Sequence, residues 1–123
     1  MTDTAGRQKA FRFGLGAETR AVWLLRLKGY VILARRWRTP GGEADIVARR
    51  GETLVFVEVK ARADLAAARE AIGPMQQRRI AAAASAWLAR HPADMARTLR
   101  FDAVFVAPGR WPVHIVNAFE RDF

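Results

Sequence analysis

The chain has 123 residues, a length that fits one domain, and its lack of cysteine excludes disulfides and cysteine-ligated metal sites. A hydrophobic fraction of 51% excludes a disordered chain. The 21 Lys and Arg residues against 12 Asp and Glu give a net charge of +9, which favours a polyanionic partner such as nucleic acid. Only three of these 21 residues are lysines, so a compositional bias of the genome is an alternative explanation of the charge.

The N-terminal segment, residues 1–13, is polar and basic and has no apolar stretch of the kind found in signal peptides. We expect it to form a flexible basic arm in front of a single domain, residues 14–123. The longest apolar stretch, residues 81–89, is too short to span a bilayer and is interrupted by Ser85. The sequence therefore predicts a soluble, cytoplasmic protein without a membrane partner.

The first half of the domain is predicted to form one helix and three strands. The helix covers residues 16–28 and ends at Gly29, a residue type common at helix C-termini. Apolar side chains cover much of its circumference, which predicts that the helix is well buried. The strands follow at residues 30–38, 43–50 and 53–60, separated by the turn sequences Thr39-Pro40-Gly41-Gly42 and Gly51-Glu52.

The second half continues with a loop at residues 62–73 and a helix at residues 74–90, with Pro74 in its first turn. Two further strands are predicted at residues 99–107 and 113–119. The resulting order, α-β-β-β-α-β-β, predicts an α/β fold with a mixed central sheet flanked by helices.

The two-residue turn at 51–52 fixes the pairing of the strands that it joins. In this register Asp45 lies directly opposite Glu58, and Glu43 lies opposite Lys60. Because side chains alternate along a strand, all four residues share one face of the hairpin. A three-residue turn with a bulge would shift this register by one residue.

Asp45 and Glu58 are candidate ligands of a divalent metal. Directly opposed residues have Cβ atoms roughly 4.5–5.5 Å apart, and like charges at that distance destabilise a sheet. Mg²⁺ or Mn²⁺ would offset the repulsion, because both ions prefer oxygen ligands. Glu58 and Lys60 also stand at the end of a strand that is apolar on both faces, where charges are costly without partners. The alternative is an ordinary ion pair that emerges at the strand end.

Glu18 is a third acidic candidate, because it lies on the same stripe of the first helix as the apolar residues Ala21 and Leu25. An equally weighted alternative is a first-turn glutamate that interacts with the helix dipole. The sequence leaves both interpretations open.

Arginines cluster near these acidic residues. We expect phosphate contacts from four of them: Arg36, Arg38, Arg78 and Arg79. Their alternative role is a solvated charged face. Trp37 lies among them and could stack on a base, but a place in the core is the favoured interpretation. His91 and His114 have no sequence partner that indicates a catalytic pair, and both are predicted to be structural.

Six short motifs occur in order along the chain: Gly16-Ala17-Glu18, Gly29-Tyr30, Arg36-Trp37-Arg38, Gly42-Glu43-Ala44-Asp45-Ile46, Phe56-Val57-Glu58-Val59-Lys60 and Arg100-Phe101-Asp102. Together they resemble the YraN-like family of small bacterial proteins, over residues 14–123. That family is similar to a branch of the PD-(D/E)xK, restriction-endonuclease-like nuclease superfamily.

The resemblance implies a restriction-endonuclease-like mixed sheet flanked by helices. It also implies that Asp45, Glu58 and Lys60 are the superfamily's acid, acid and lysine, and that Glu18 is the first-helix glutamate of many members. The nearest pattern is that of archaeal Holliday-junction resolvases, which are dimeric, so the resemblance leaves a homodimer open.

The chain departs from this pattern at three positions. Ala44 stands in place of the superfamily's proline before the aspartate. Arg36 replaces the asparagine of the family's Arg-Asn-Trp-Arg stretch, and Gln76 replaces a lysine that would fit a phosphate contact. None of these changes removes a predicted metal ligand.

The favoured function is a metal-dependent endonuclease that hydrolyses phosphodiester bonds in DNA, with branched or structured DNA as one option. Asp45 and Glu58 would hold Mg²⁺ or Mn²⁺, and Lys60 would orient or deprotonate the attacking water. Two alternatives have the same fold: a non-catalytic nucleic-acid-binding module and an interaction scaffold. The presence of all three residues favours the enzyme, because a binding module could lose them freely.

Overall fold

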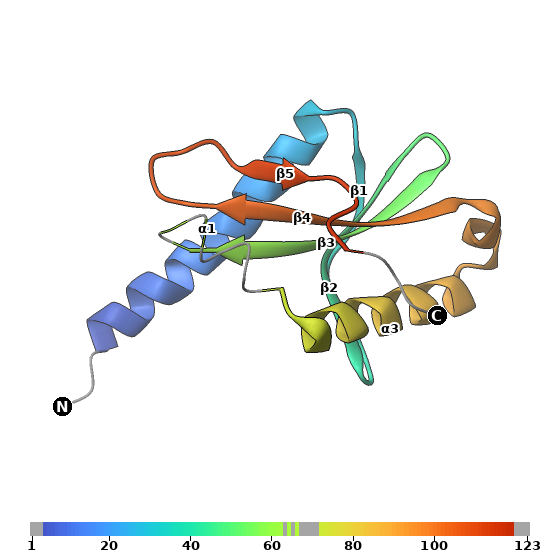
Figure 1. Cartoon of the computed structure of the whole chain (residues 1–123), viewed down its shortest axis with the longest axis horizontal. Helices are drawn as coiled ribbons and strands as arrows, with labels where there is room; N and C mark the ends of the chain where they lie inside the picture. The colour runs from blue at the N-terminus through green and yellow to red at the C-terminus, as the bar shows by residue number, and fades with distance from the viewer. Residues whose placement is uncertain (1–3, 63, 65, 67–71, 120–123) are drawn as a thin grey trace.

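A five-stranded β-sheet forms the centre of the molecule, with one long helix against each face (Figure 1). The computed structural model describes residues 4–62, 64, 66 and 72–119. The elements are, in chain order, α1 (Thr4–Leu27), β1 (Val31–Thr39), β2 (Gly42–Arg50), β3 (Thr53–Ala61), α3 (Pro74–Arg90), the 3₁₀ helix η1 (Pro92–Ala96), β4 (Thr98–Val106) and β5 (Val113–Ile115). The predicted α/β class, with a mixed sheet flanked by helices, is confirmed.

The strands lie side by side in their sequence order, β1-β2-β3-β4-β5. Three of the four neighbouring pairs are antiparallel, whereas β3 and β4 are parallel. A parallel pair needs a long crossover, and α3 lies in that connection. β3 is therefore the central strand and is covered on both faces, which explains why its sequence is apolar at successive positions.

The two faces of the sheet carry separate apolar cores. The core on the α1 side contains Ala17, Ala21, Val22, Leu25, Ile46, Ala48, Val55, Val57, Val104 and Val106. The core on the α3 side contains Ala44, Val47, Leu54, Phe56, Ile80, Ala83, Ala84, Trp87 and Phe101. Trp37 packs edge-on against Trp87 in the second core, with ring centroids 4.9 Å apart, so its predicted core position is confirmed. The His91 ring stacks on the Trp87 ring, with ring centroids 4.0 Å apart, which agrees with a structural role.

α1 begins earlier than the sequence predicted. The expected helix started at residue 16, but the observed helix starts at Thr4 and includes most of the segment that was expected to be an arm. The glycines at 14 and 16 suggested a boundary, because each costs about 1 kcal/mol in a helix interior. The helix continues through both of them, and residues 1–3 of the expected arm lie outside the described part of the chain.

The remaining boundaries agree with the predictions to within one residue, except at the C-terminal end. β5 stops at Ile115 rather than at residue 119. Asn117 adopts a left-handed backbone with φ 55°, and its N–H donates to the Asp102 carboxylate instead of to a neighbouring strand. The regular ladder with β4 therefore ends before this point, although the Ala118 N–H still donates to the Phe101 carbonyl oxygen at 2.8 Å. The predicted loop at 62–73 falls mostly outside the described residues.

The register predicted for the second hairpin is confirmed. Arg50 pairs with Thr53, and the antiparallel ladder continues without a shift to Ile46 and Val57. Gly51 takes φ 60° at the first central position, as a type II′ turn requires.

Gly42 allows α3 to lie directly on the start of β2. A Cβ atom at this position would be 2.6 Å from the Ala83 nitrogen and 2.7 Å from the Arg79 oxygen, both in the α3 backbone. Only glycine permits so close an approach without displacement of the helix.

In the part of the chain that the structure describes, no helix is both long and apolar enough to cross a membrane.

Candidate functional site

The predicted acidic site lies where β2 and β3 separate. Their ladder ends at Ile46 and Val57, one position before Asp45 and Glu58. Beyond that point a side chain replaces the backbone carbonyl as hydrogen-bond acceptor, because Oδ2 of Asp45 accepts the N–H of Val59 at 2.7 Å. The carboxylate is thereby fixed against β3. The ladder stops before the level at which Glu43 was predicted to face Lys60.

The alternation of side chains also breaks at Asp45. Ala44 packs in the α3-side core and Ile46 in the α1-side core, although residues two apart normally share a face. The neighbouring strand is irregular at the same level, since Arg36 takes φ 52°, which is uncommon for a residue with a side chain. Irregularities of this kind re-aim side chains and are over-represented next to functional sites.

Glu58 is buried at the end of β3 and forms an ion pair with Lys60, whose Nζ lies 3.2 Å from Oε1. Burial raises the pKa of Glu58 to about 7, and the negative charge of Asp45 adds to this effect, whereas Lys60 opposes it. Burial also raises the pKa of Asp45, and the charges of Glu43 and Glu18 contribute. Burial and the neighbouring acidic charges together outweigh the effect of Lys60 on the pKa of Glu58.

Glu18 is held by two consecutive arginines of β1. Nε of Arg35 donates to Oε1 at 3.1 Å, and Nε of Arg36 donates to Oε2 at 3.0 Å. Consecutive residues of a regular strand point to opposite faces, so the left-handed backbone at Arg36 explains how both reach one carboxylate. The first-turn interpretation of Glu18 is wrong, because α1 begins at Thr4 and the glutamate lies in its second half. Arg35 was not among the four predicted phosphate contacts.

Glu43 joins the strand pair to α3. Nε of Arg38 on β1 lies 3.7 Å from its Oε2, and a guanidinium nitrogen of Arg79 on α3 lies 3.6 Å from the same oxygen. Both arginines stay largely exposed, as does Arg78 on the same helix. Three of the four predicted phosphate contacts, Arg36, Arg38 and Arg79, thus lie beside acidic residues of the site.

A pocket of about 200 Å³ opens at this place. Its lining consists of Ala17, Glu18, Asp45, Val59, Lys60, Ala61 and Arg62. The pocket brings Glu18, Asp45 and Lys60 together, and Glu58 adjoins it through the ion pair with Lys60.

Carboxylate oxygens are the donors that Mg²⁺ and Mn²⁺ prefer, so the chemistry of this site fits either ion. Within the described residues, however, no three His, Asp or Glu side chains are close enough together to form a ready-made metal cluster. A cation would have to draw the carboxylates of Asp45 and Glu58 toward itself, and its attraction would offset their mutual repulsion.

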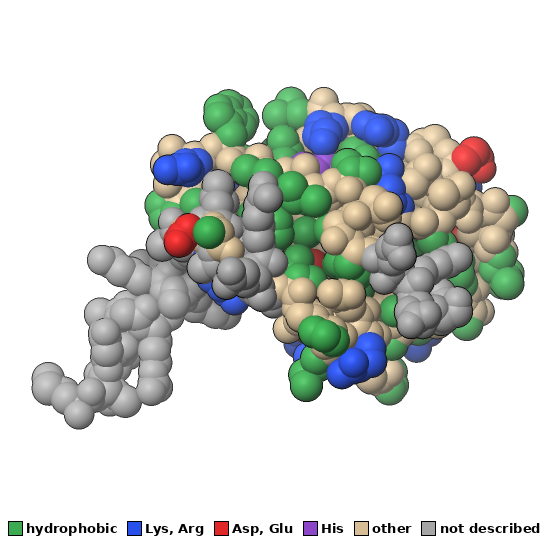
Figure 2. Space-filling view, viewed as in Figure 1, with side chains coloured by type: hydrophobic (Ala, Val, Ile, Leu, Met, Phe, Trp, Pro, Cys, Tyr) green, Lys and Arg blue, Asp and Glu red, His purple; other side chains and the backbone are tan. Residues whose placement is uncertain are grey.

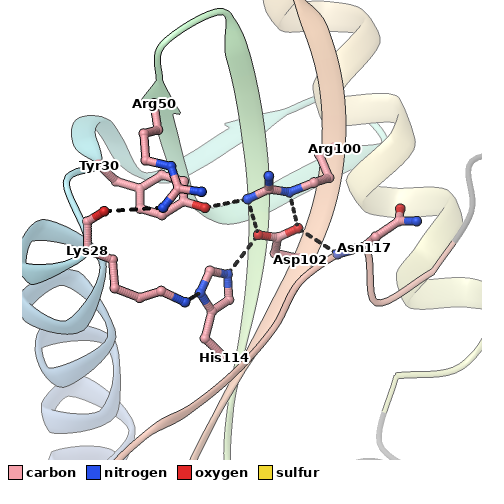
Figure 3. Close-up of polar contacts among 7 residues, drawn as sticks. All are labelled: Lys28, Tyr30, Arg50, Arg100, Asp102, His114 and Asn117. Atoms are coloured by element: carbon pink, nitrogen blue, oxygen red, sulfur yellow. Dashed lines mark hydrogen bonds and ion pairs between the residues drawn. The ribbon is translucent and has the colours of Figure 1, made fainter.

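A second polar cluster, which the sequence did not reveal, lies between β4, β5 and the end of α1 (Figure 3). Its centre is the fully buried Asp102. Arg100 donates to both carboxylate oxygens at 2.9 Å, Nε2 of His114 lies 2.7 Å from Oδ2, and the N–H of Asn117 donates to Oδ1 at 2.9 Å. The other ring nitrogen of His114 contacts Nζ of Lys28, so the cluster ties the helix to the sheet.

The cluster keeps Asp102 ionised. Burial alone would raise the pKa of Asp102, but the hydrogen bonds from His114, Arg100 and the Asn117 backbone outweigh it, and the pKa lies below its ordinary value. His114 is enclosed by this network, in agreement with its predicted structural role. The spacing of Arg100 and Asp102 places them on one face of a strand, which could have indicated the ion pair. The contribution of His114 depends on how β5 folds back and has no local signal.

The comparisons with known proteins agree on one family. Residues 17–106 match the model of the uncharacterised protein family UPF0102. A UPF0102 protein of Methylocella silvestris is 54% identical over 123 residues, which is 100% of this chain and 99% of the relative. A UPF0102 protein of Mesorhizobium japonicum is 58% identical over 117 residues, 94% of this chain and 93% of the relative. The chain therefore belongs to the UPF0102, or YraN-like, family.

Proposed function

We propose that this protein is a metal-dependent nuclease of the PD-(D/E)xK type that hydrolyses phosphodiester bonds in nucleic acid, with DNA as the first substrate to test. The observation that supports it is the pair of acidic residues at the end of the β2–β3 hairpin. Glu58 is buried beside Asp45, and its pKa rises to about 7. Burial and the charge of Asp45 make the ionised form of Glu58 costly, and a cation bound in the working protein would offset that cost.

Asp45 and Glu58 are the residues that would hold Mg²⁺ or Mn²⁺. When bound, such an ion lowers the pKa of a water molecule and stabilises negative charge on a phosphate oxygen. Asp45 is pre-positioned by the Val59 N–H, which fixes Oδ2, and the other carboxylate oxygen would be available to an ion. Glu58 would exchange part of its contact with Lys60 for the cation.

Lys60 supplies a proton donor and positive charge on the same side of β3 as Glu58. Its ammonium, released in part from Glu58, can hold the attacking water or a non-bridging phosphate oxygen in position. Arg36 is bound to Glu18 of the pocket wall, and Arg38 and Arg79 are bound to Glu43. These guanidinium groups can bind neighbouring phosphates, since they pair well with phosphate oxygens. Glu18, on the pocket wall, can orient a water or a ligand of the ion.

Single-turnover cleavage tests the proposal. Wild-type protein should cut at least one of single-stranded, duplex or branched DNA or RNA in Mg²⁺ or Mn²⁺. Lys60→Ala and Lys60→Arg should lose most of the cleavage rate while they keep nucleic-acid binding. Glu52→Gln is the matched control, because this carboxylate is 86% exposed at the hairpin turn.

A non-catalytic binding module is the second candidate. It is favoured by one observation: Asp45 and Glu58 already have protein partners, the Val59 N–H and Lys60. If the wild type cleaves none of the substrates, or if both Lys60 variants cleave at the wild-type rate, the protein is a binding module and not a nuclease.

A further inference from the structure

A groove between α1 and the loop that joins β4 to β5 takes no part in the chemistry proposed above. Its volume is about 350 Å³, and the lining residues that matter are Arg20, Trp23, Leu24, Leu27, Arg110 and Trp111. Figure 2 shows hydrophobic side chains that stand out from the surface over this loop, with Lys and Arg side chains nearby.

The groove is held in shape by Arg20. One guanidinium nitrogen donates to the carbonyl oxygen of Ala107 at 3.2 Å, and the other donates to the carbonyl oxygen of Arg110. Arg20 of α1 thus fixes the backbone at Ala107 and Arg110, in the loop that carries Trp111. The two walls of the groove, one from α1 and one from the loop, are therefore connected through defined hydrogen bonds.

Two large aromatic side chains of the groove face solvent. The exposed fraction is 58% for Trp23 and 80% for Trp111, whereas Trp37 and Trp87 pack together in the core. Leu27, next to them on α1, is 75% exposed. Apolar residues gathered in one exposed patch commonly mark a binding surface.

Three arginines lie at this patch. Arg20 and Arg110 belong to the lining, and the guanidinium of Arg26 lies 5.4 Å from the centre of the Trp23 ring. Among the described residues, no acidic side chain belongs to the lining of the groove. A second copy of this chain would bring the same arginines into a two-fold interface, where they would repel one another. The groove instead suits a partner that is negatively charged and has flat aromatic faces.

We propose that this groove binds single-stranded nucleic acid, with unpaired bases stacked on Trp23 and Trp111 and phosphates paired with Arg20, Arg26 and Arg110. Tryptophan and arginine side chains together form the usual stacking platform for unpaired strands, whereas the bases of a duplex are already stacked on one another. The inference deepens the proposed function and rests on its nucleic-acid partner. It names the substrate class as one that contains an unpaired strand.

The position of the groove relative to the acidic pocket supports this substrate class. α1 contributes Glu18 to the pocket and Trp23 to the groove, five residues further along the helix. At a rise of 1.5 Å per residue these positions are about 8 Å apart along the helix axis. They also differ by about 140° around that axis, and Glu18 is buried whereas Trp23 is exposed. A substrate that contacts both therefore has to bend around α1, which a flexible unpaired segment joined to a duplex can do.

The test compares three probes in a fluorescence binding assay: a short oligothymidylate, an abasic strand of equal length and a duplex. Wild-type protein should bind the oligothymidylate more tightly than the abasic strand and should show quenched tryptophan emission. Trp23→Ala and Trp111→Ala should each weaken binding of the oligothymidylate roughly 5- to 150-fold, the range expected for one stacked base. Trp111→Phe should retain most of the affinity, whereas Trp111→Leu should not.

Met95→Ala is the matched control, because this apolar side chain is 69% exposed elsewhere on the surface and should not affect binding. Equal affinity for the abasic strand, or unchanged affinity in both alanine variants, would overturn the inference. So would a wild-type dimer that Trp111→Ala converts to a monomer, since a second copy would then occupy the groove.

Asp45→Asn separates this inference from the nuclease proposal. The variant should keep tryptophan-dependent strand binding and lose cleavage. If both tryptophan variants cleave at the wild-type rate, and the protein binds the abasic strand as tightly as the oligothymidylate, only the groove proposal is overturned. Tryptophan-dependent binding without cleavage by the wild type would overturn the nuclease alone.

Discussion

The Asp45 carboxylate accepts the backbone N–H of Val59 at 2.7 Å, across the gap where β2 leaves β3. This bond fixes the side chain without the help of a cationic partner. Arg35 and Arg36 are bound to Glu18, and Lys60 is bound to Glu58, so the negative charge of Asp45 is left largely uncompensated. This uncompensated charge is the basis on which we propose a cation at the site.

We expect Mn²⁺ to bind through Asp45 and Glu58, because a cation offsets the cost of burying these carboxylates in their ionised form, to which the neighbouring acidic charges add. Isothermal titration calorimetry should show binding by the wild type and at least a ten-fold weaker affinity for the Asp45→Asn, Glu58→Gln double variant, on the order of 1.4 kcal/mol. Glu52→Gln should bind as the wild type does. Equal binding by wild type and double variant would place the metal site elsewhere.

The metal-free protein should lose stability as the pH rises from about 4.5 to about 7. Burial raises the pKa of Glu58 from 4.5 to about 7, so the folded state binds a proton more tightly than the unfolded state does. This stabilisation is complete below the unfolded pKa and is lost as the pH rises through the folded pKa. Urea denaturation with a chelator, over a series of pH values, measures it. Glu58→Gln should show a smaller decline, and identical profiles would contradict the assignment.

Nucleic-acid binding should be salt-sensitive. Each phosphate contact contributes a slope of roughly −0.9 to a plot of log K against log salt for duplex DNA. The Arg38→Ala, Arg78→Ala double variant should therefore lose about two units of slope relative to the wild type. Arg50→Ala is the control, since this arginine lies at the far end of β2 and donates to the Lys28 carbonyl. A flat response of the wild type would exclude the electrostatic mode.

Asp102→Asn should lower the free energy of unfolding by about 3 kcal/mol, because removal of one charge from a buried network leaves its partners uncompensated. The affected partners are Arg100 and His114, which both contact the Asp102 carboxylate. Chemical denaturation measures the change, and an exposed substitution such as Glu52→Gln should stay within about 0.5 kcal/mol of the wild type. A similarly small change for Asp102→Asn would show that the network contributes little.

Gly42→Ala should destabilise the protein by about 1–3 kcal/mol, because the added Cβ would collide with the backbone of α3. Gly16→Ala is the opposite case. No atom lies within 4 Å of a Cβ at that position, and alanine favours a helix interior by about 1 kcal/mol. Thermal or urea denaturation of the two variants should thus give changes of opposite sign. A neutral Gly42→Ala would mean that α3 shifts away without cost.

The fold was predictable because local signals agree with the tertiary structure. Turn residues at 39–42 and 51–52 fix both hairpins, and the register of the second follows from the length of its turn. The start of α1 was not predictable, because glycines at 14 and 16 mimic a boundary that the helix ignores. The end of β5 was not predictable either, since Asn117 turns toward Asp102, a residue 15 positions earlier.

The candidate site was predictable where it depends on strand register and not where it depends on strand irregularity. The predicted register of the β2–β3 hairpin placed Asp45 at the level of Glu58. The alternation of side chains along β3 placed Glu58 and Lys60 on the same face of that strand. Arginine is not a residue type that predicts a left-handed backbone, whereas a glycine or an asparagine at position 36 would have predicted one. The double arginine contact with Glu18 follows from that single dihedral angle.

The parallel pairing of β3 with β4 has a consequence for biosynthesis. Thr53 pairs with Thr98, so β3 leaves the ribosome well before its partner does. At roughly 5–20 residues per second, several seconds pass in which β3 has one neighbour and an open edge of apolar residues. Such an edge invites pairing with other nascent chains. The strand that carries Glu58 and Lys60 therefore has one unpaired edge until translation reaches β4.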